Sequence, residues 1–297
     1  MRYAIVSDIH ANWAALNAVI QDATAAQIDA FWCLGDVVGY GPHPEECVHF
    51  LHDRVDHNQW VIGNHDAGLI GLMTTADFSA EARAMLEIHR AILQHPTNQG
   101  LWEWCQAQMT EVRTNPRSSV HGDIKFVLVH ACLTPDHYVG RTSASYLYPW
   151  NSLLLRWNGL DPLRDTHLEE NGCACMLYGH THIPTFAEVM TRRRISLRSI
   201  RYNHPLPLNG QLLAINPGSV GQPRDGDQRA AYAIIDTDDH TVEFRRVAYD
   251  LTQLLQLMAD RAYPHTLYER LRLAGNPADH QSLAEVYQRT VDGLEAI

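Results

Sequence analysis

Residues 2–13, RYAIVSDIHANW, contain both the start of an α/β fold and its first polar cluster. The apolar run at the beginning is typical of a buried strand, and Asn12 is a plausible cap for a segment of helical periodicity over 13–26. Asp8 and His10 lie between the two elements. Side chains two residues apart on an extended segment point the same way, so both can face one site.

The order of strand, loop and helix continues along the first half of the chain. The runs at 30–35 and 59–63 are strand-like, and 45–51 is helix-like after two prolines. Strands that alternate with helices predict a largely parallel sheet. Helical periodicity over 79–109 predicts two helices, and we interpret the segment around them, about 70–115, as a small helical cap inserted between strands.

The second half is expected to be mainly antiparallel. A strand at 125–130 precedes a segment without a clear period, 131–172, which is long for a connection. Short apolar strands separated by turn residues follow, at CACMLYG, TFAEVM, RRISLRSI, QLLAIN, AAYAIID and TVEFRRV. A helical tail is expected over about 251–297. The sequence therefore predicts one α/β domain over 1–297 with a helical cap, a long loop and a helical extension at the C-terminus.

Composition restricts the classes of partner. The 297 residues carry 23 basic and 34 acidic side chains, a net charge of −11, so the chain as a whole should repel nucleic acid and anionic membranes. The apolar run at the start stops at Asp8, which predicts neither a signal peptide nor a membrane anchor. Six cysteines without zinc-ribbon spacing are expected to be reduced thiols of a cytoplasmic protein.

Five polar clusters each follow an apolar strand directly. They are D-x-H at 8–10, G-D at 35–36, G-N-H-D at 63–66, a single histidine at 130, and G-H-T-H at 179–182. Because ligands of open α/β sheets bind beyond the carboxyl ends of strands, these groups are expected to converge. D-x-H alone is a weak signal, since 165–167 and 238–240 carry it in other contexts. The ordered set of five favours a metal site.

This ordered set resembles the pattern of the calcineurin-like metallophosphoesterases: D-x-H, G-D, G-N-H-[DE], H and G-H-x-H. The resemblance covers roughly residues 1–250. The stretches GDVVGYGP at 35–42 and INPGSVGQPRDGD at 215–227 are most similar to a bacterial and archaeal branch that includes YfcE-like and diadenosine tetraphosphatase-related proteins. The resemblance implies a two-sheet α/β sandwich with metals at one edge.

The resemblance also implies a site for two divalent cations. Asp8, His10 and His182 would hold one metal, Asn64, His130 and His180 would hold the other, and Asp36 would bridge them. Carboxylate, amide and imidazole ligands favour Mn, with Fe, Zn, Co or Ni as alternatives. A hydroxide that bridges the metals is the expected nucleophile. His65 would face the substrate and protonate the leaving oxygen.

The group that would orient His65 is an open question at this point. Relatives with G-D-x-x-D use the last aspartate, but this chain has Gly39 there, and Asp66 is one candidate replacement. The chain also lacks the D-R-G of phosphoprotein phosphatases and has Ile62 where they carry arginine. Phosphoprotein substrates are therefore disfavoured.

The 215–227 stretch offers candidate contacts to substrate. Asn216 and Gly218 would form a sharp turn whose backbone amides approach the site, or a turn that only packs against the 179–182 loop. Arg224 would contact a substrate phosphate, or pair with a neighbouring aspartate.

We therefore expect a phosphohydrolase that cleaves ester or anhydride bonds of small phosphorylated molecules or nucleotides, a class that includes dinucleoside polyphosphate hydrolases. A nuclease with the same metal chemistry is an alternative, disfavoured by the acidic chain. A non-catalytic scaffold that binds a protein partner is another, disfavoured because all seven ligands and His65 are present. The sequence indicates no oligomeric state.

Overall fold

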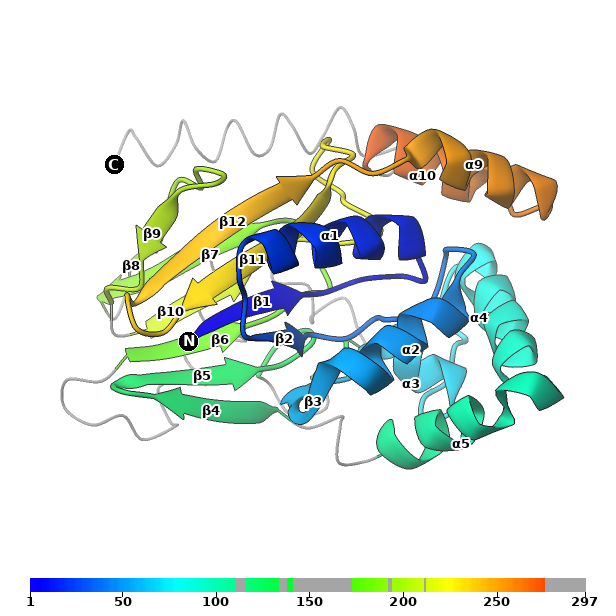
Figure 1. Ribbon diagram of the computed structural model, residues 1–297, viewed down its shortest axis with the longest axis horizontal. Coiled ribbons are helices and arrows are strands. Elements are labelled where there is room, and N and C mark those ends of the chain that lie inside the picture. The colour runs from blue at the N-terminus through cyan, green and yellow to red at the C-terminus, as the bar shows by residue number, and fades with distance from the viewer. Residues whose placement is uncertain (111–115, 134–137, 141–172, 192–193, 211, 276–297) are drawn as a thin grey trace.

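The computed structural model describes residues 1–110, 116–133, 138–140, 173–191, 194–210 and 212–275, which form two facing six-stranded sheets with helices around them (Figure 1). The order in the first sheet is β3 (Val55–Trp60), β2 (Ala30–Cys33), β1 (Arg2–Val6), β11 (Ala230–Asp236), β12 (Thr241–Val247) and β9 (Pro205–Pro207). The order in the second is β4 (Arg117–His121), β5 (Ile124–Leu128), β6 (Cys173–Leu177), β10 (Leu212–Asn216), β7 (Thr185–Thr191) and β8 (Arg194–Leu197). The predicted two-sheet α/β sandwich is confirmed.

Each sheet mixes parallel and antiparallel pairs. In the first, β1, β2 and β3 are parallel, and β11, β12 and β9 continue the sheet in antiparallel fashion. In the second, β5, β6 and β10 are parallel, and the remaining pairs are antiparallel. β1, β2 and β5 all run toward the end of the molecule where the helices gather (Figure 1). The mainly antiparallel second half therefore has a parallel core that the sequence pattern did not predict.

Strand β1 shows how the layers are held together. It is buried on both faces: Tyr3 and Ile5 belong to the apolar core between the two sheets, whereas Ala4 and Val6 pack beneath the first helix. Parallel strands that are covered by other elements on both faces need apolar side chains on both faces. Trp32 and Phe126 join the core between the sheets from opposite sides, with ring centroids 5.4 Å apart.

The described part of the chain forms seven α-helices and one short 3-10 helix. They are α1 (Trp13–Ala25), α2 (Pro44–Arg54), α3 (Asn64–Leu69), α4 (Ala80–Leu93), η1 (Pro96–Asn98), α5 (Gln99–Gln108), α9 (Leu251–Asp260) and α10 (His265–Leu273). Asn12 caps α1 as expected, because its side chain accepts the amide of Ala15. None of the described helices combines the length and apolar character that a membrane span requires.

Helices α4 and α5 occupy the range predicted for the cap, and α9 and α10 occupy the first part of the predicted tail. Trp102 and Trp104 of α5 pack against the apolar core, and Trp104 stacks on Trp60 at 5.8 Å. Most of the predicted loop 131–172, and the tail beyond residue 275, lie outside the described residues. The sequence pattern missed α3, β4 and β9.

Candidate metal centre

The five polar clusters meet at one edge of the sandwich. Each cluster follows the carboxyl end of a strand: Asp8 and His10 follow β1, Asp36 follows β2, Asn64 follows β3, His130 follows β5, and His180 and His182 follow β6. All seven side chains are buried. The predicted convergence of these residues is therefore what the structure shows, and both sheets contribute.

Three overlapping groups of ligand-type atoms lie within this edge, and two of them consist only of predicted ligands, whereas the third joins His65 to His10 and Asp36. In the first, Nε2 of His182 is 3.2 Å from Oδ1 of Asp8 and 3.1 Å from Nε2 of His10. In the second, Oδ2 of Asp36 lies 3.4 Å from Nε2 of His130, and this group includes His180. Asp36 also lies 3.8 Å from Nε2 of His10, so its carboxylate stands between the two groups.

Backbone carbonyls fix which nitrogen of each ring faces the centre. The Nδ1 atoms of His10, His130 and His182 donate to the carbonyls of Val38 (3.0 Å), Leu34 (2.7 Å) and Gln222 (2.6 Å). A carbonyl only accepts, so Nδ1 carries the proton and the Nε2 lone pair points inward when the ring is neutral. A hydrogen bond from the ring nitrogen that faces away from the metal is the usual arrangement around metal-bound histidines.

The backbone at the centre is strained. Five of the seven residues have left-handed backbone conformations, with φ between 49° and 65°: Asp8, His10, Asp36, His180 and His182. Residues other than glycine rarely adopt this region, and each such position costs about 1–3 kcal/mol. Strain of this kind clusters at functional sites because the surrounding structure has to impose it.

The two carboxylates keep their charge in spite of burial. Burial alone would raise the pKa of Asp36, but His130 and His65 hold it well below its usual range. Oδ1 of Asp36 accepts the amide of His65 at 2.8 Å, which leaves Oδ2 facing the histidines. Asp8 accepts the hydroxyl of Ser7 and the amide of His180, at 2.6 and 3.1 Å.

The histidines differ in charge. Burial lowers the pKa of His182, and Arg224 lowers it further, so this ring is neutral at neutral pH. Burial would lower the pKa of His130 too, but Asp36 and Asp8 raise it to about 9. The second group therefore holds a proton that a cation would have to displace, whereas the first does not.

The residues fit a pair of divalent cations. In the first group, two Nε2 lone pairs and a carboxylate oxygen lie 3.1 to 4.0 Å from one another, and none of the three brings a proton to share. The buried Oδ1 of Asn64, which follows β3 at the same edge, has no hydrogen-bond partner among the described residues, as expected of an oxygen placed to bind a cation.

His65 lies in an aromatic enclosure beside the centre. Its ring contacts Tyr40, Phe78 and His10, with centroids 4.6, 5.0 and 4.9 Å away. The absence of a side chain at Gly39 makes room for it, since a Cβ there would lie 2.4 Å from Nδ1 of His65. Burial lowers the pKa of His65 to about 4.

Asp66 does not orient His65, which corrects the candidate suggested by the sequence. Its carboxylate accepts the amides of Val37 (2.9 Å), Val38 (3.2 Å) and Gly63 (3.0 Å). Burial and the nearby charge of Asp36 raise the pKa of Asp66 to about 7. Asp66 therefore connects the loops after β2 and β3 through hydrogen bonds to their backbone amides.

The 215–227 stretch reaches the centre in two different ways. The buried side chain of Asn216 donates to the carbonyl of Gly179 (2.7 Å) and accepts the amide of Gly218 (2.9 Å), which favours the alternative that this turn packs against the 179–182 loop. Arg224 donates to the side chain of Gln222 at 3.0 Å and lies close enough to His182 to lower its pKa. The aspartates next to it pair with other arginines.

His89 is a buried polar residue beside the centre that the sequence pattern did not reveal. It lies on α4, is completely buried, accepts the amide of Gly39 on Nδ1 (3.2 Å) and donates from Nε2 to the carbonyl of Gly41 (2.8 Å). The loop that it holds carries Tyr40, which packs against His65. The only signal in the sequence was a lone polar residue on the apolar face of a predicted helix.

Comparisons with known proteins agree with this geometry. The model of the calcineurin-like phosphoesterase superfamily domain matches residues 1–240. The uncharacterized protein MJ0912 of Methanocaldococcus jannaschii is 30% identical over 270 residues, which cover 91% of this chain and 97% of that protein. A symmetrical bis(5'-nucleosyl)-tetraphosphatase of Psychromonas ingrahamii is 30% identical over 133 residues, 44% of each chain.

A solved structure supports the same conclusion across the whole fold. The metallophosphoesterase from Sphaerobacter thermophilus superposes with a TM-score of 0.68 and 31% sequence identity, covering 92% of this chain and 99% of that one. The match to the family model extends over most of the chain and includes all seven residues of the centre. The chain belongs to the calcineurin-like phosphoesterase superfamily, and it is a metal-dependent phosphohydrolase.

Proposed function

We propose that this chain hydrolyses phosphate ester or anhydride bonds of small molecules or nucleotides with two divalent cations. In this proposal Asp8, His10 and His182 hold one cation, Asn64, His130 and His180 hold the other, and Asp36 is shared. Mn is the favoured metal, with Fe, Zn, Co or Ni as alternatives, because the ligands combine carboxylate, amide and imidazole.

The observation that carries the proposal is the contact between His10 and His182. Their Nε2 atoms lie 3.1 Å apart, and each ring has committed its other nitrogen to a backbone carbonyl. Two lone pairs at this distance repel each other, and Oδ1 of Asp8 adds a negative charge 3.2 Å from His182. A cation among the three atoms would turn this repulsion into attraction.

The mechanism divides between the cations and the protein. When bound, a pair of divalent cations acidifies a water molecule and neutralises charge on the phosphate oxygens. The chain itself aims the imidazoles, because the carbonyls of Val38, Leu34 and Gln222 accept from Nδ1 and leave Nε2 toward the centre. Its burial of the centre keeps bulk water away, which strengthens each electrostatic contact.

His65 is the proposed residue at the leaving group. Because its pKa is lowered to about 4, its ring is neutral at neutral pH and presents one N–H group. We propose that this N–H donates to the leaving oxygen and that the charge of a bound phosphate favours its protonation. Arg224, beside His182, is the proposed contact for a further phosphate oxygen.

A nucleotide is the favoured kind of substrate. The similarity to symmetrical bis(5'-nucleosyl)-tetraphosphatases supports it, although the match spans 44% of the length of the protein from Psychromonas ingrahamii. The net charge of −11 disfavours the alternative of a nuclease on long nucleic acid. A cytoplasmic location and the absence of membrane or nucleic-acid partners remain predictions from the sequence.

The decisive experiment compares metal-stripped and Mn-loaded protein on a panel of phosphomonoesters, phosphodiesters and dinucleoside polyphosphates. We expect two Mn per chain by elemental analysis, and turnover only in the loaded sample. Equal activity without metal, or binding of a single ion, would contradict the two-metal proposal. Degradation of single-stranded DNA or RNA in preference to every small substrate would favour the nuclease.

A further inference from the structure

The stretches 35–42 and 215–227 enclose the loop that carries Asp8 and His10. On one side the amide of Gly41 donates to the carbonyl of His10 at 2.9 Å. On the other side the amide of Gly221 donates to the carbonyl of Asp8 at 3.0 Å. A Cβ at Gly221 would lie 1.8 Å from the carbonyl oxygen of Ile9, so this contact admits only glycine. The first group is thus held between two loops.

These two loops also orient the first pair of histidines. Val38, in the 35–42 loop, accepts from His10, and Gln222, in the other loop, accepts from His182. A change in the spacing of the loops would therefore change how the two Nε2 atoms face each other. The second group is supported differently, because His130 donates to Leu34 at the end of β2, inside the core between the sheets.

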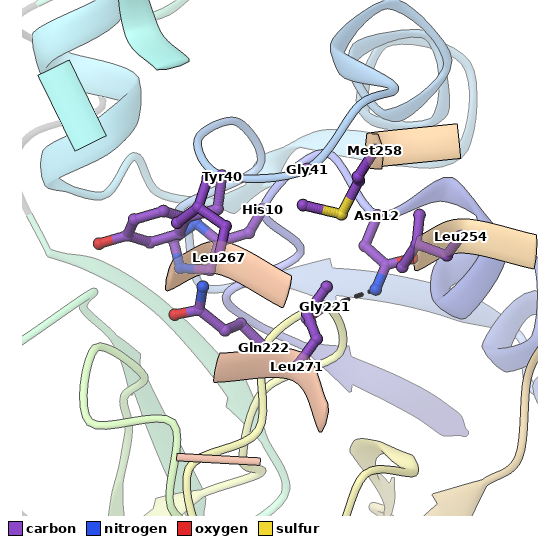
Figure 2. A pocket seen from close by; sticks show the side chains of 10 residues that line it. All are labelled: His10, Asn12, Tyr40, Gly41, Gly221, Gln222, Leu254, Met258, Leu267 and Leu271. Carbon is purple, nitrogen blue, oxygen red and sulfur yellow. Dashed lines mark hydrogen bonds between the residues drawn. The ribbon is translucent and has the colours of Figure 1, made fainter. Parts of the chain in front are cut away.

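The helix pair α9–α10 covers both loops from outside. Figure 2 shows a small pocket between the helix pair and the two loops. The helices line it with Leu254 and Met258 of α9 and with Leu267 and Leu271 of α10. The rest of the lining is His10, Asn12, Tyr40 and Gly41 on one side and Gly221 and Gln222 on the other. The four apolar side chains are buried in a cluster that includes Tyr40 and the α4 residues Ala82 and Met85. The helix pair therefore contacts the first loop through this cluster, at Tyr40, and the second loop through the pocket, at Gly221 and Gln222.

Polar contacts fasten the helix pair to each loop. Arg261, at the end of α9, donates to the carbonyl of Pro42 at 2.7 Å. Beyond α10, the carbonyl of Ala274 accepts the amide of Gly226 at 3.0 Å, and the side chain of Gln228 donates to the carbonyl of Arg272. The helix pair is therefore hydrogen-bonded to both stretches.

We propose that α9–α10 is a positioning element for the Asp8, His10 and His182 group, with Arg261 as its positioning residue on the 35–42 loop. The proposal rests on the proposed function, because it assumes that this group binds a cation. It goes beyond it by giving a role to helices that lie outside the part of the chain matched by the family model, residues 1–240. The helices act chiefly on the first group, because Asp36, the ligand that the second group shares, lies at the opposite end of the 35–42 stretch from Pro42.

The test measures Mn affinity one group at a time. His130→Ala leaves the first group as the site for Mn, and His182→Ala leaves the second. Arg261→Met is added to each, and Mn affinity is measured by electron paramagnetic resonance of the free ion. We expect Arg261→Met to weaken Mn binding about fivefold in the first background, the effect of one lost hydrogen bond, and to weaken it much less in the second, which shares the 35–42 stretch only through Asp36. Arg261→Lys, which keeps a cationic donor, should recover part of the loss.

Arg272→Met is the matched control, since its guanidinium pairs with Glu269 in the same helix. It should change neither affinity. Equal weakening in both backgrounds, or no change in either, would overturn the proposal. If a histidine variant fails to fold, the comparison can be made in protein that keeps all the metal ligands. The quantity measured is then the Mn concentration at which half of the protein holds a spin-coupled pair of Mn ions. Arg261→Met should raise this concentration about fivefold. Absence of any coupled pair in the unchanged protein would instead refute the two-metal function.

Discussion

The two sheets make unequal contributions to the centre. Strands β1, β2 and β3 of the first sheet precede both carboxylates, the amide oxygen and one imidazole, whereas β5 and β6 of the second sheet precede only imidazoles. Each group nevertheless combines the two sources: Asp8 and His10 meet His182, and Asp36 meets His130 and His180. The negative charge of the centre thus comes from one sheet, and three of its four imidazoles come from the other.

The difference teaches that neither sheet contains a site by itself. A bound cation would connect the two sheets at their edge, in addition to the apolar core that joins them along their faces. Support for the rings also crosses between the sheets, because Leu34 beyond β2 accepts from His130 beyond β5. A substitution of a ligand on either sheet should therefore change both the activity and the packing of the two sheets.

The largest effect is expected from Asp36→Asn, because its carboxylate is shared by both groups. We expect kcat/KM to fall by roughly 10³-fold, since loss of outer partners alone costs about 10–100-fold at metal sites. Steady-state kinetics of the Mn-loaded variant would measure the fall. Asp53→Asn, on the exposed end of α2, is the control and should be unaffected. Retained activity in Asp36→Asn would contradict the role of a shared ligand.

Metal should also stabilise the connection between the sheets. At a free metal concentration of about 100 times Kd, each bound cation adds about 2.7 kcal/mol to the free energy of unfolding, so two cations should raise Tm by about 10 °C. Differential scanning calorimetry with and without Mn would measure the shift. His130→Ala, which removes one ligand of the second group, should retain about half of it. A Tm indifferent to metal would contradict a cation between the sheets.

The sequence predicted the parts of the centre that depend on local structure. A strand that ends at Asp8, or at Gly179 before His180, is visible in the apolar pattern alone, and polar residues at such ends are expected to converge. Convergence depends only on strand direction, so it did not require the edge strands β4 and β9, which the sequence pattern missed.

The contacts that orient these side chains could not be predicted, because each joins segments far apart in the chain. The carbonyl of Gln222 that accepts from His182 is 40 residues away, and the one that accepts from His130 is 96 residues away. Backbone carbonyls carry no residue identity, so a sequence gives no signal for them. Asp66 was misjudged for a related reason: its three partners are amides.

Proton release should distinguish the two groups. The pKa of His130 is raised to about 9, so below this pH a cation must displace its proton, and affinity at the second group should fall about tenfold for each unit from pH 8 to pH 6. His182 has a lowered pKa, so binding at the first group should release fewer protons than binding at the second in this range. Calorimetric titration of His182→Ala with Mn, in buffers of different ionisation enthalpy, should report about one proton. No dependence on buffer would contradict the assignment.

The smallest effect on activity is expected at His89, which touches only the loop after β2 and so tests the first sheet alone. His89→Leu leaves the amide of Gly39 and the carbonyl of Gly41 without partners, at a cost of about 1–3 kcal/mol in the free energy of unfolding. Activity should fall only severalfold, because His89 reaches His65 through the loop. His95→Gln, an exposed histidine beyond the same helix, is the control.

The pH dependence of this variant gives a second measurement with a defined sign. Burial lowers the pKa of His89 to about 4, below its usual value of 6.5, so the folded protein resists a proton that the unfolded chain accepts. This contribution to stability is complete above pH 6.5 and is lost toward pH 4, by about 2 kcal/mol between pH 7.5 and pH 5. The His89→Leu variant has no histidine at this position, so its free energy of unfolding does not fall in this way toward pH 5. Its deficit in unfolding free energy, measured by urea denaturation, should therefore be largest at pH 7.5 and narrow at pH 5, whereas a constant deficit would mean that the pKa of His89 is the same in the folded and unfolded protein.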